Sequence, residues 1–260
     1  MSIINYFDNF IIGECNQGQR KEGVQFGGKY ICDRLNIEPI IIVQNKLFNS
    51  IENKEDNGYE FISKILSTNK RTMLIGGDHS LGISSVDAFL NLYKDELSVL
   101  WIDAHADIND HLTSLTGNIH GMSLGYHHHK RADKPCWRTS PYKLKSSQLY
   151  YFGIRDLDPP EINLIRTDGI GYSTEIDENL YNFINNSKYL LISFDVDALD
   201  PEFMDSTGVI ADNGLRPDNV KDIISYSINS GKLIHLDLME FNPSIGNPEK
   251  SFEALEYIFK

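Results

Sequence analysis

Short apolar runs alternate with amphipathic segments along this chain, and this alternation constrains the fold more than any other feature. The runs are rich in Ile, Leu and Val, which is typical of strands buried on both faces. Strands are expected at NFIIG, PIIIV, TMLIG, LSVLWID, LYYFGI, YLLISFDV and LIHLDLM. Helices are expected at Gly23–Leu35, Tyr59–Thr68, Gly82–Tyr93, Asp177–Asn185, Asp218–Ser230 and Pro248–Phe259. We therefore predict an α/β fold, a three-layer sandwich in which helices flank a mostly parallel central sheet.

Length and composition are those of an ordinary globular protein. The chain has 260 residues, of which 41% are hydrophobic and 23% charged, so a substantial core is expected. No repeat and no linker rich in Pro, Gly or Ser divides it, and we predict one domain over residues 1–260. The least regular part is Asp107–Gln148. A loop of that length inside a compact domain is usually functional.

Charge and cysteine content narrow the class of protein. The formal net charge of −13 argues against nucleic-acid binding, which normally uses a basic surface, and is compatible with cationic ligands. Cys15, Cys32 and Cys136 are widely spaced and odd in number, which favours a reducing compartment. The sequence shows no signal peptide and no apolar segment near the ~20 residues that cross a bilayer. We expect a cytoplasmic protein that binds neither nucleic acid nor membrane.

Acidic residues and histidines gather at the ends of four expected strands. They are Asp78 and His79, then Asp103, His105 and Asp107, then Asp195 and Asp197, and lastly Asp237 and Glu240. In open parallel sheets, ligands bind beyond the carboxyl ends of the strands. Asp103, His105 and Asp107 occupy every second position, and would share one face of a strand that continued through them. One such Asp is usually a helix cap or a solvated loop residue, but the repetition predicts a shared centre.

Metal chemistry explains such a centre. Bare carboxylates at one point repel one another and are prohibitively costly to bury, whereas divalent cations remove the problem. An oxygen-rich set with two imidazoles suits Mn²⁺ better than structural zinc, which prefers thiolates. Six protein ligands fit two ions about 3.5–4 Å apart, with two of the aspartates bridging. The predicted ligands are His79, Asp103, His105, Asp107, Asp195 and Asp197.

A series of stretches resembles the ureohydrolase family, the binuclear manganese enzymes that include arginase and agmatinase. In order, they are GQRKEGVQFGG, GGDHS, DAHADIN, GNIHG, GIRDLDPPE, SFDVDALDP and LDLMEFNPS. The resemblance covers most of the chain, from about Gly13 to Ser244, and is greatest to arginase. It implies the arginase-like sandwich and two Mn²⁺ ions, with Co²⁺, Ni²⁺ or Fe²⁺ as substitutes. It also implies that Asp103 and Asp195 bridge the ions.

The resemblance further implies three catalytic roles. A hydroxide between the ions would be the nucleophile, and Asp107 would orient it. His120 would shuttle protons, a task suited to a side chain that titrates near neutral pH. Glu240 would pair with the planar guanidinium of the substrate.

Two further segments match positions at which arginases recognise the amino-acid end of their substrate. Asn109, Ser114 and Thr116 would contact the α-carboxylate, and Asp158 and Glu161 would lie near the α-amino group. The second segment, DPPE, could instead simply cap a helix, with Pro at its first turn. Together the segments favour L-arginine as the guanidino substrate, cleaved to L-ornithine and urea.

Thr207–Asn219 departs from the family pattern. Val209 replaces a Thr near the guanidinium end of the site, which places substrate fit in question. Two alternatives therefore remain: a ureohydrolase for another guanidino compound, of the agmatinase, guanidinobutyrase or formimidoylglutamase type, and a non-catalytic arginine-binding member. Asp218 and Asn219 replace an Arg-Glu pair that supports subunit contacts in the family. This weakens the expectation of a homo-oligomer, which the family forms as a trimer or hexamer.

Other polar features receive structural interpretations. The run His127–His129 could bind a metal, but it lies in a polar loop beside Lys130 and Arg131, and we expect a solvated loop. Cys136 and Trp137 are expected to pack within that loop. Asn213-Gly214 is expected to form a turn with positive φ.

Overall fold

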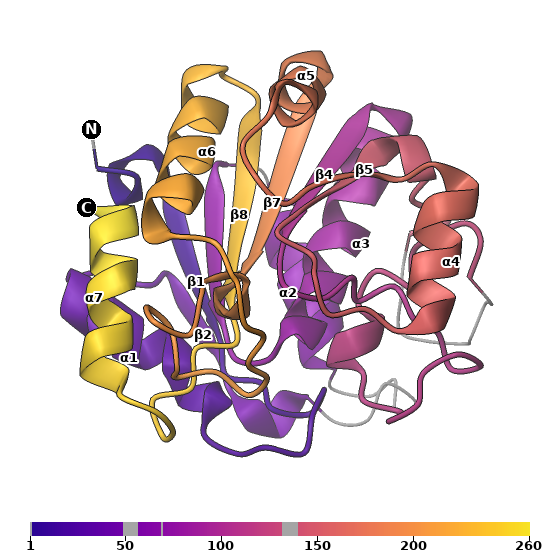
Figure 1. Ribbon diagram of the computed structural model, residues 1–260. Helices are drawn as coiled ribbons and strands as arrows, with labels where there is room; N and C mark the ends of the chain where they lie inside the picture. The colour runs from indigo at the N-terminus through magenta and orange to yellow at the C-terminus, as the bar shows by residue number, and fades with distance from the viewer. Residues whose placement is uncertain (1, 49–56, 69, 132–139) are drawn as a thin grey trace.

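A parallel sheet forms the centre of the protein (Figure 1). The computed structural model describes residues 2–48, 57–68, 70–131 and 140–260. The sheet has eight strands in the order β2-β1-β3-β8-β7-β4-β5-β6, and every neighbouring pair is parallel. The strands are β1 Asn9–Gly13, β2 Ile41–Val43, β3 Thr72–Gly76, β4 Leu97–Ile102, β5 Leu149–Phe152, β6 Gly171–Ser173, β7 Tyr189–Asp195 and β8 Leu233–Met239.

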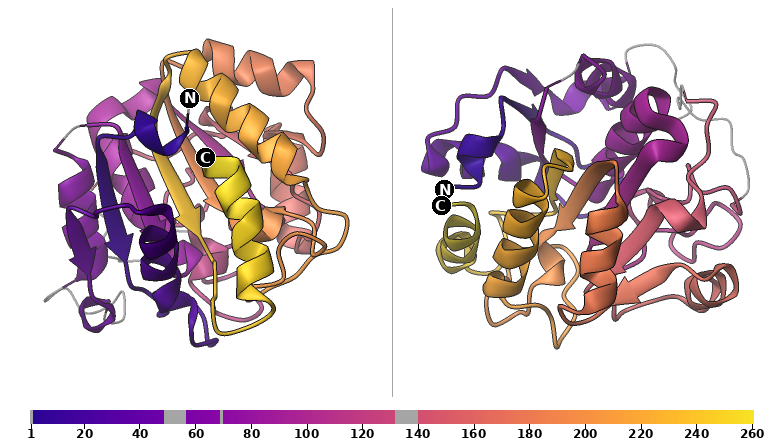
Figure 2. Two further views of the ribbon diagram at one scale, coloured as in Figure 1. Left: turned by 90° about the vertical axis from the view of Figure 1, so that its left-hand side faces the viewer. Right: turned by 90° about the horizontal axis from the view of Figure 1, so that it is seen from above.

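Helices cover both faces of this sheet, which confirms the predicted three-layer sandwich (Figures 1 and 2). One face packs against α1 Gly27–Leu35, α5 Glu178–Asn186, α6 Pro217–Asn229 and α7 Pro248–Phe259. The other packs against α2 Gly58–Leu66, α3 Gly82–Tyr93 and α4 Pro159–Asp168. None of the helices in the described ranges has the length and apolar character to cross a bilayer.

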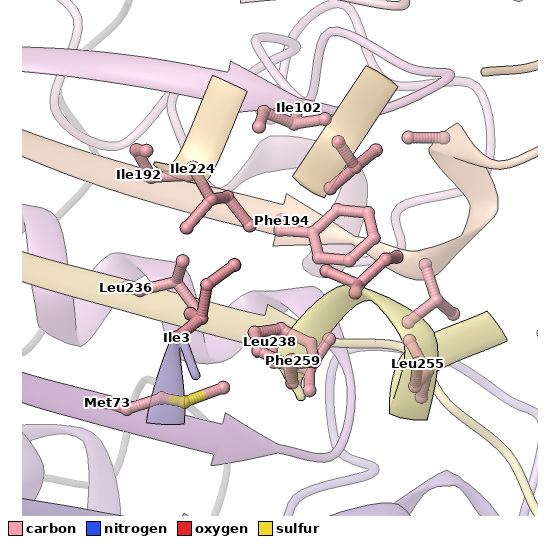
Figure 3. Close-up of a cluster of buried hydrophobic side chains, with 14 of the residues drawn as sticks. Ile3, Met73, Ile102, Ile192, Phe194, Ile224, Leu236, Leu238, Leu255 and Phe259 are labelled. Atoms are coloured by element: carbon pink, nitrogen blue, oxygen red, sulfur yellow. The ribbon is translucent and has the colours of Figure 1, made fainter. Parts of the chain in front are cut away.

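Alternate residues of each strand supply the two cores. In β4, Leu100 and Ile102 belong to the core under α6 and α7, whereas Val99 and Trp101 belong to the core under α2 and α3. Figure 3 shows part of the first core, where strand residues such as Ile102 lie among side chains from α6 and α7. Fully burying one such side chain contributes about 1.5–3 kcal/mol. Burial on both faces is why these strands read as continuous apolar runs.

Two elements lie outside the predicted list. The α4 helix begins at Pro159 and ends at Asp168, followed by Gly169 at φ 65°, which suits a helix C-terminus. The stretch DPPE, whose pattern is that of a helix cap, is its sequence signal and lies at the start of this helix. The three-residue β6 is an edge strand too short to show a pattern. The predicted turn at Asn213-Gly214 is confirmed by a positive φ of 61° at Asn213.

The middle of the sheet positions the polar strand ends. β3, β8, β7 and β4 are adjacent, although β3 and β4 are consecutive along the chain. All four run in the same direction, so their carboxyl ends meet at one edge of the sheet. The residues after these four strands are therefore brought together.

Gly77 permits a close backbone approach at this edge. A Cβ atom at Gly77 would lie 1.8 Å from the carbonyl oxygen of Cys15, closer than any side-chain carbon can be. Its own carbonyl accepts a hydrogen bond of 2.9 Å from the backbone N–H of Glu240. Gly77 thus joins the ends of β1, β3 and β8 two residues before His79.

We predict that Gly77→Ala destabilises the metal-free protein by about 1–3 kcal/mol, the usual range for overpacking a filled site. Gly121→Ala is the matched control, because a Cβ there meets nothing within 4 Å. Its unfolding free energy should stay within about 0.5 kcal/mol of the wild type. Urea denaturation measures both. Equal stability of the two variants would show that the β1–β3 contact tolerates a side chain.

Candidate metal centre and active site

The polar residues that follow the four central strands surround one pocket of about 180 Å³. His79 follows β3, Asp103 to Asp107 follow β4, Asp195 ends β7, and Glu240 follows β8. The pocket is lined by His105, Asp107, Asn109, His120, Gly121, Asp156, Asp158, Glu161, Asp195, Asp197, Val209 and Glu240. His79 and Asp103 are fully buried beside this lining and within hydrogen-bond distance of it.

Asp103, His105 and Asp107 do not continue the strand that precedes them. β4 ends at Ile102, and the backbone then bends. Asp107 has a φ of 49°, in the left-handed region that costs a non-glycine residue about 1–3 kcal/mol. Glu240 has a φ of 68°. The side chains converge because of these local backbone conformations, and such strain is typical of functional sites.

One group of ligand-type atoms centres on His79. Its Nδ1 lies 3.1 Å from Asp103 Oδ2, 3.2 Å from Asp107 Oδ2 and 3.0 Å from Asp195 Oδ2. Atoms about 2.0–2.1 Å from a common ion lie roughly 3–3.5 Å from one another. The spacing of this group is therefore suitable for holding a metal ion.

A second group centres on His105 and shares Asp103 with the first. His105 Nδ1 lies 3.4 Å from Asp103 Oδ1 and 3.1 Å from Asp197 Oδ2. Asp103 thus faces one histidine with each of its carboxylate oxygens. Asp195 connects the groups differently, since its Oδ1 accepts the backbone N–H of Asp197 at 2.8 Å. The two groups are adjacent and have a carboxylate in common, as a two-ion site would require.

A buried hydrogen-bond chain fixes the orientation of the His79 ring. His79 Nε2 lies 2.9 Å from Ser193 Oγ, and that hydroxyl donates to Asp237 Oδ2 at 3.0 Å. Because the Ser193 proton is directed to Asp237, the Ser193 oxygen accepts from His79 Nε2–H. In the neutral ring of His79, the form that binds a metal, the lone pair is therefore on Nδ1, which faces the carboxylates.

Trp101 supports the same centre from β4. Its ring stacks on the His79 ring, with centroids 4.2 Å apart and planes 6° apart. Its Nε1–H donates to Asp103 Oδ2 at 2.9 Å. Sequence reasoning gave no role to Trp101 or Ser193, although their positions two residues before Asp103 and Asp195 place them on the same face of their strands.

The electrostatics show how unfavourable these carboxylates are without a cation. Burial raises the pKa of Asp107 and of Asp195 well above the usual range, and neighbouring carboxylates raise both further. Although burial opposes it, hydrogen bonds with His105 and His79 hold the pKa of Asp103 below its usual value. One carboxylate stays ionised and its neighbours resist ionisation. A divalent cation would stabilise all of them in the charged form.

Glu240 and His120 form a pair on one side of the pocket. Glu240 Oε1 accepts from the backbone N–H of His79 at 2.9 Å and lies 3.0 Å from His120 Nδ1. Its Oε2 accepts from Gln19 Nε2 at 2.6 Å, a contact that no sequence pattern predicts. Burial lowers the pKa of His120, but the hydrogen bond and charge of Glu240 outweigh it and raise that pKa to about 9.

The expected substrate-end residues divide into two sets. Asn109, Asp158 and Glu161 line the pocket, and Asn109 Nδ2 donates to Asp158 Oδ2 at 2.9 Å. Ser114 and Thr116 do not line it, and their hydroxyls accept the backbone N–H groups of nearby loop residues.

Glu161 also has the capping role that DPPE left open. Its carboxylate accepts from the backbone N–H groups of Asp158 at 3.0 Å and Ile108 at 3.2 Å. The first bond closes the N-terminus of α4, and the second ties that helix to the loop after β4.

The solvated-loop expectation for His127–His129 is wrong for the first two residues, whereas His129 is exposed as expected. His127 and His128 are fully buried, and His127 Nε2 lies 3.0 Å from the carbonyl oxygen of Ile83. The loop therefore packs onto the start of α3. Cys136 and Trp137 lie outside the described residues; Cys15 and Cys32 are buried free thiols.

Comparison with known proteins agrees with this geometry. The sequence profile of the Arginase family matches residues 11–258. Arginase-1 of Bos taurus is 32% identical over 242 residues, which cover 86% of this chain and 74% of the relative. The structure of Entamoeba histolytica arginase in complex with L-ornithine superposes with a TM-score of 0.80 at 24% identity, over 96% of this chain and 97% of that one. The formimidoylglutamase of Bacillus subtilis gives 0.78 at 16%, over 96% and 84%. Because an arginase and a formimidoylglutamase both share this fold, the fold alone does not identify the substrate of this chain.

We predict that Trp101→Phe weakens Mn²⁺ binding by about 10- to 100-fold, the usual cost of losing an outer partner of a metal ligand. The phenyl ring retains stacking on His79, but the N–H donor to Asp103 is lost. Tyr150→Phe is the matched control, because it removes a buried hydrogen bond to Ser173 in the opposite core. Titration of metal-free protein with Mn²⁺ measures both affinities. Unchanged affinity in Trp101→Phe would remove Trp101 from the support of the centre.

Proposed function

Since this chain belongs to the arginase family of metal-dependent amidinohydrolases, we propose that it hydrolyses the guanidinium group of L-arginine to L-ornithine and urea. The observation that carries the proposal is the pair of histidine-centred ligand groups that share Asp103 beneath the pocket. The Asp–His spacing matches a two-ion centre, and Glu240 lies where a guanidinium could pair with it.

We propose that two Mn²⁺ ions bind there, with Co²⁺, Ni²⁺ or Fe²⁺ as substitutes. One would be held by His79, Asp103, Asp107 and Asp195, and the other by Asp103, His105, Asp195 and Asp197. The donor set fits these ions, since it is rich in carboxylate oxygen, includes two imidazoles and contains no thiolate. The resistance of Asp107 and Asp195 to ionisation supports the same conclusion. When bound, the ions would lower the pKa of water enough to supply a nucleophile near neutral pH.

The side chains of the pocket would bind the guanidinium, orient the nucleophile and protonate the leaving amine. Glu240, held in place by Gln19 and the His79 backbone, presents a buried carboxylate to the guanidinium. Asp107 orients the attacking nucleophile. As the C–N bond breaks, the amine of ornithine needs a proton, which His120 supplies. Because His120 Nδ1 is engaged with Glu240, its Nε2 is the atom that exchanges protons with the substrate.

Substrate choice rests on the other end of the pocket. We propose that Asp158 and Glu161 attract the α-ammonium of arginine, while Asn109, Ser114 and Thr116 bind its α-carboxylate. Asn109 and Asp158 line the pocket and hydrogen-bond each other. Ser114 and Thr116 would have to approach the substrate from the adjoining loop.

A second candidate is a ureohydrolase for a guanidino compound without an α-carboxylate, such as agmatine. The pocket lining favours it in one respect: among the described residues, the lining contains several carboxylates and neither Lys nor Arg. Such a lining attracts a cationic chain end and offers little to an anionic one. Val209 in the lining also differs from the Thr that arginases use.

We predict that Asp195→Ala loses both metal ions and all urea release. Its Oδ2 faces His79 and its Oδ1 fixes Asp197, so removing the carboxylate affects both ligand groups. Asp212→Ala, which removes an exposed carboxylate, is the control and should keep wild-type metal content. Elemental analysis gives metal per chain. Full two-ion occupancy in Asp195→Ala would contradict the assignment.

We predict that the Mn²⁺-loaded wild type prefers L-arginine to agmatine and guanidinobutyrate by a large factor in a urea-release assay. Asp158→Ala should lower kcat/KM for arginine roughly ten- to a hundredfold, since a hydrogen bond to a charged group is worth ~1.5–3 kcal/mol. Asp212→Ala is again the control. Hydrolysis of agmatine as fast as arginine would favour the second candidate. Absence of urea from every compound, with both ions bound, would contradict both.

A further inference from the structure

A second cluster of metal-binding side chains lies apart from the pocket just described. His128, His129 and Asp168 offer ligand atoms that all lie within 4.8 Å of one another. Asp168 is the last residue of α4, and the histidines belong to the loop that packs on α3. None of the three lines the pocket of the candidate active site.

The His129 ring directs a lone pair at a carboxylate. Its Nδ1 lies 3.2 Å from the carbonyl oxygen of Leu144, which can only accept, so Nδ1 carries the proton in the neutral ring. Its Nε2 then presents a lone pair to Asp168 Oδ2 at 3.5 Å. Two electron-rich atoms at this separation repel each other unless a proton or a metal ion lies between them, and 3.5 Å is close to the spacing of two ligands on one ion.

His128 adds a fully buried imidazole to the cluster. His128 Nε2 lies 3.1 Å from Ser146 Oγ, and that hydroxyl donates to Asp168 Oδ2 at 2.7 Å. In the metal-free state Ser146 thus links His128 to Asp168 where an ion would otherwise connect them.

The position of Asp168 also favours a cation. A carboxylate at the C-terminus of a helix is destabilised by the negative end of the helix dipole, unless a positive charge lies close to it. Lys130 Nζ lies 3.7 Å from Asp168 Oδ1, and this lysine side chain is half exposed. An exposed ammonium is held weakly and is readily displaced.

We propose that His128, His129 and Asp168 form a separate site for a divalent ion that prefers imidazole, with Zn²⁺ as the best match. Two histidines and one carboxylate are a known zinc donor set, and water would take the fourth position. Binding requires the neutral His128 ring to carry its proton on Nδ1, giving up the bond from Nε2 to Ser146 and the 3.3 Å contact from Lys130 N. The ion would join the loop after His120 to the C-terminus of α4.

The test counts zinc on the full chain at about pH 8, where an imidazole of ordinary pKa is neutral. Metal-free protein is equilibrated with excess Zn²⁺, desalted and analysed for zinc. His129→Ala and Asp168→Asn should each retain one zinc equivalent fewer than the wild type. His111→Ala, which removes an exposed histidine elsewhere, should retain the wild-type amount. Zinc at the candidate active site contributes equally to all four proteins, so the difference does not depend on the proposed function.

A second measurement uses the thermal stability that a bound ion confers. Excess Zn²⁺ should raise the Tm of His111→Ala as much as that of the wild type, and that of His129→Ala and Asp168→Asn by less. Zinc affinity at this site should fall by more than the roughly 10- to 100-fold that losing an outer partner costs. Wild-type zinc content in His129→Ala or Asp168→Asn would overturn the site. Equal loss in His111→Ala would show loose binding to surface histidines and would also overturn it.

Discussion

Carboxylates buried at the ends of adjacent parallel strands are the constraint on which the rest of the structure depends. Asp107 and Asp195 resist ionisation because burial and their neighbours both disfavour charge. Asp237 is also fully buried, but its carboxylate is stabilised by hydrogen bonds from the side chains of Ser85, Ser193 and His235. A buried carboxylate is stable when donors satisfy it, and otherwise requires a cation. The pocket-facing aspartates have the second environment, which suits them to hold a metal ion.

The donors around Asp237 also make the centre rigid. Thr72 on β3 lies 2.7 Å from His235 Nδ1 on β8, whose Nε2 lies 2.6 Å from Asp237. The chain continues through Ser193 on β7 to the His79 ring. Three neighbouring strands thus share one buried polar network, and each member has a partner. Such a network fixes one arrangement of side chains, which is what a metal centre requires.

The sequence predicted the strands of the sheet well because they are carried by local patterns, and the same patterns pointed to the polar strand ends that the fold brings together. Apolar runs identify strands, and a strand followed by Asp or His identifies an edge where ligands bind. The order of strands was not predictable, since β8 and β7 enter between β3 and β4 through contacts distant in sequence. The left-handed backbone at Asp107 and the burial of His128 could not be predicted from the sequence for the same reason. Both are imposed by tertiary packing against the local preference of these residues. Gln19 had a place in a recognised stretch, but only the fold brings it to Glu240.

Charge at the pocket decides what can enter it. Glu240, Asp158 and the other carboxylates of the lining make the pocket acidic, so it suits a cationic ligand. Arginine and agmatine both satisfy this, and they differ in the α-carboxylate. In an acidic pocket an α-carboxylate is unfavourable unless amide and hydroxyl donors surround it. Because Asn109 already donates one side-chain N–H to Asp158, the hydroxyls of Ser114 and Thr116 have to supply the other hydrogen bonds to an α-carboxylate. The proposed selectivity for arginine therefore rests on the hydroxyls of Ser114 and Thr116 reaching the α-carboxylate, since the proposed metal centre would act on the guanidinium that both molecules share.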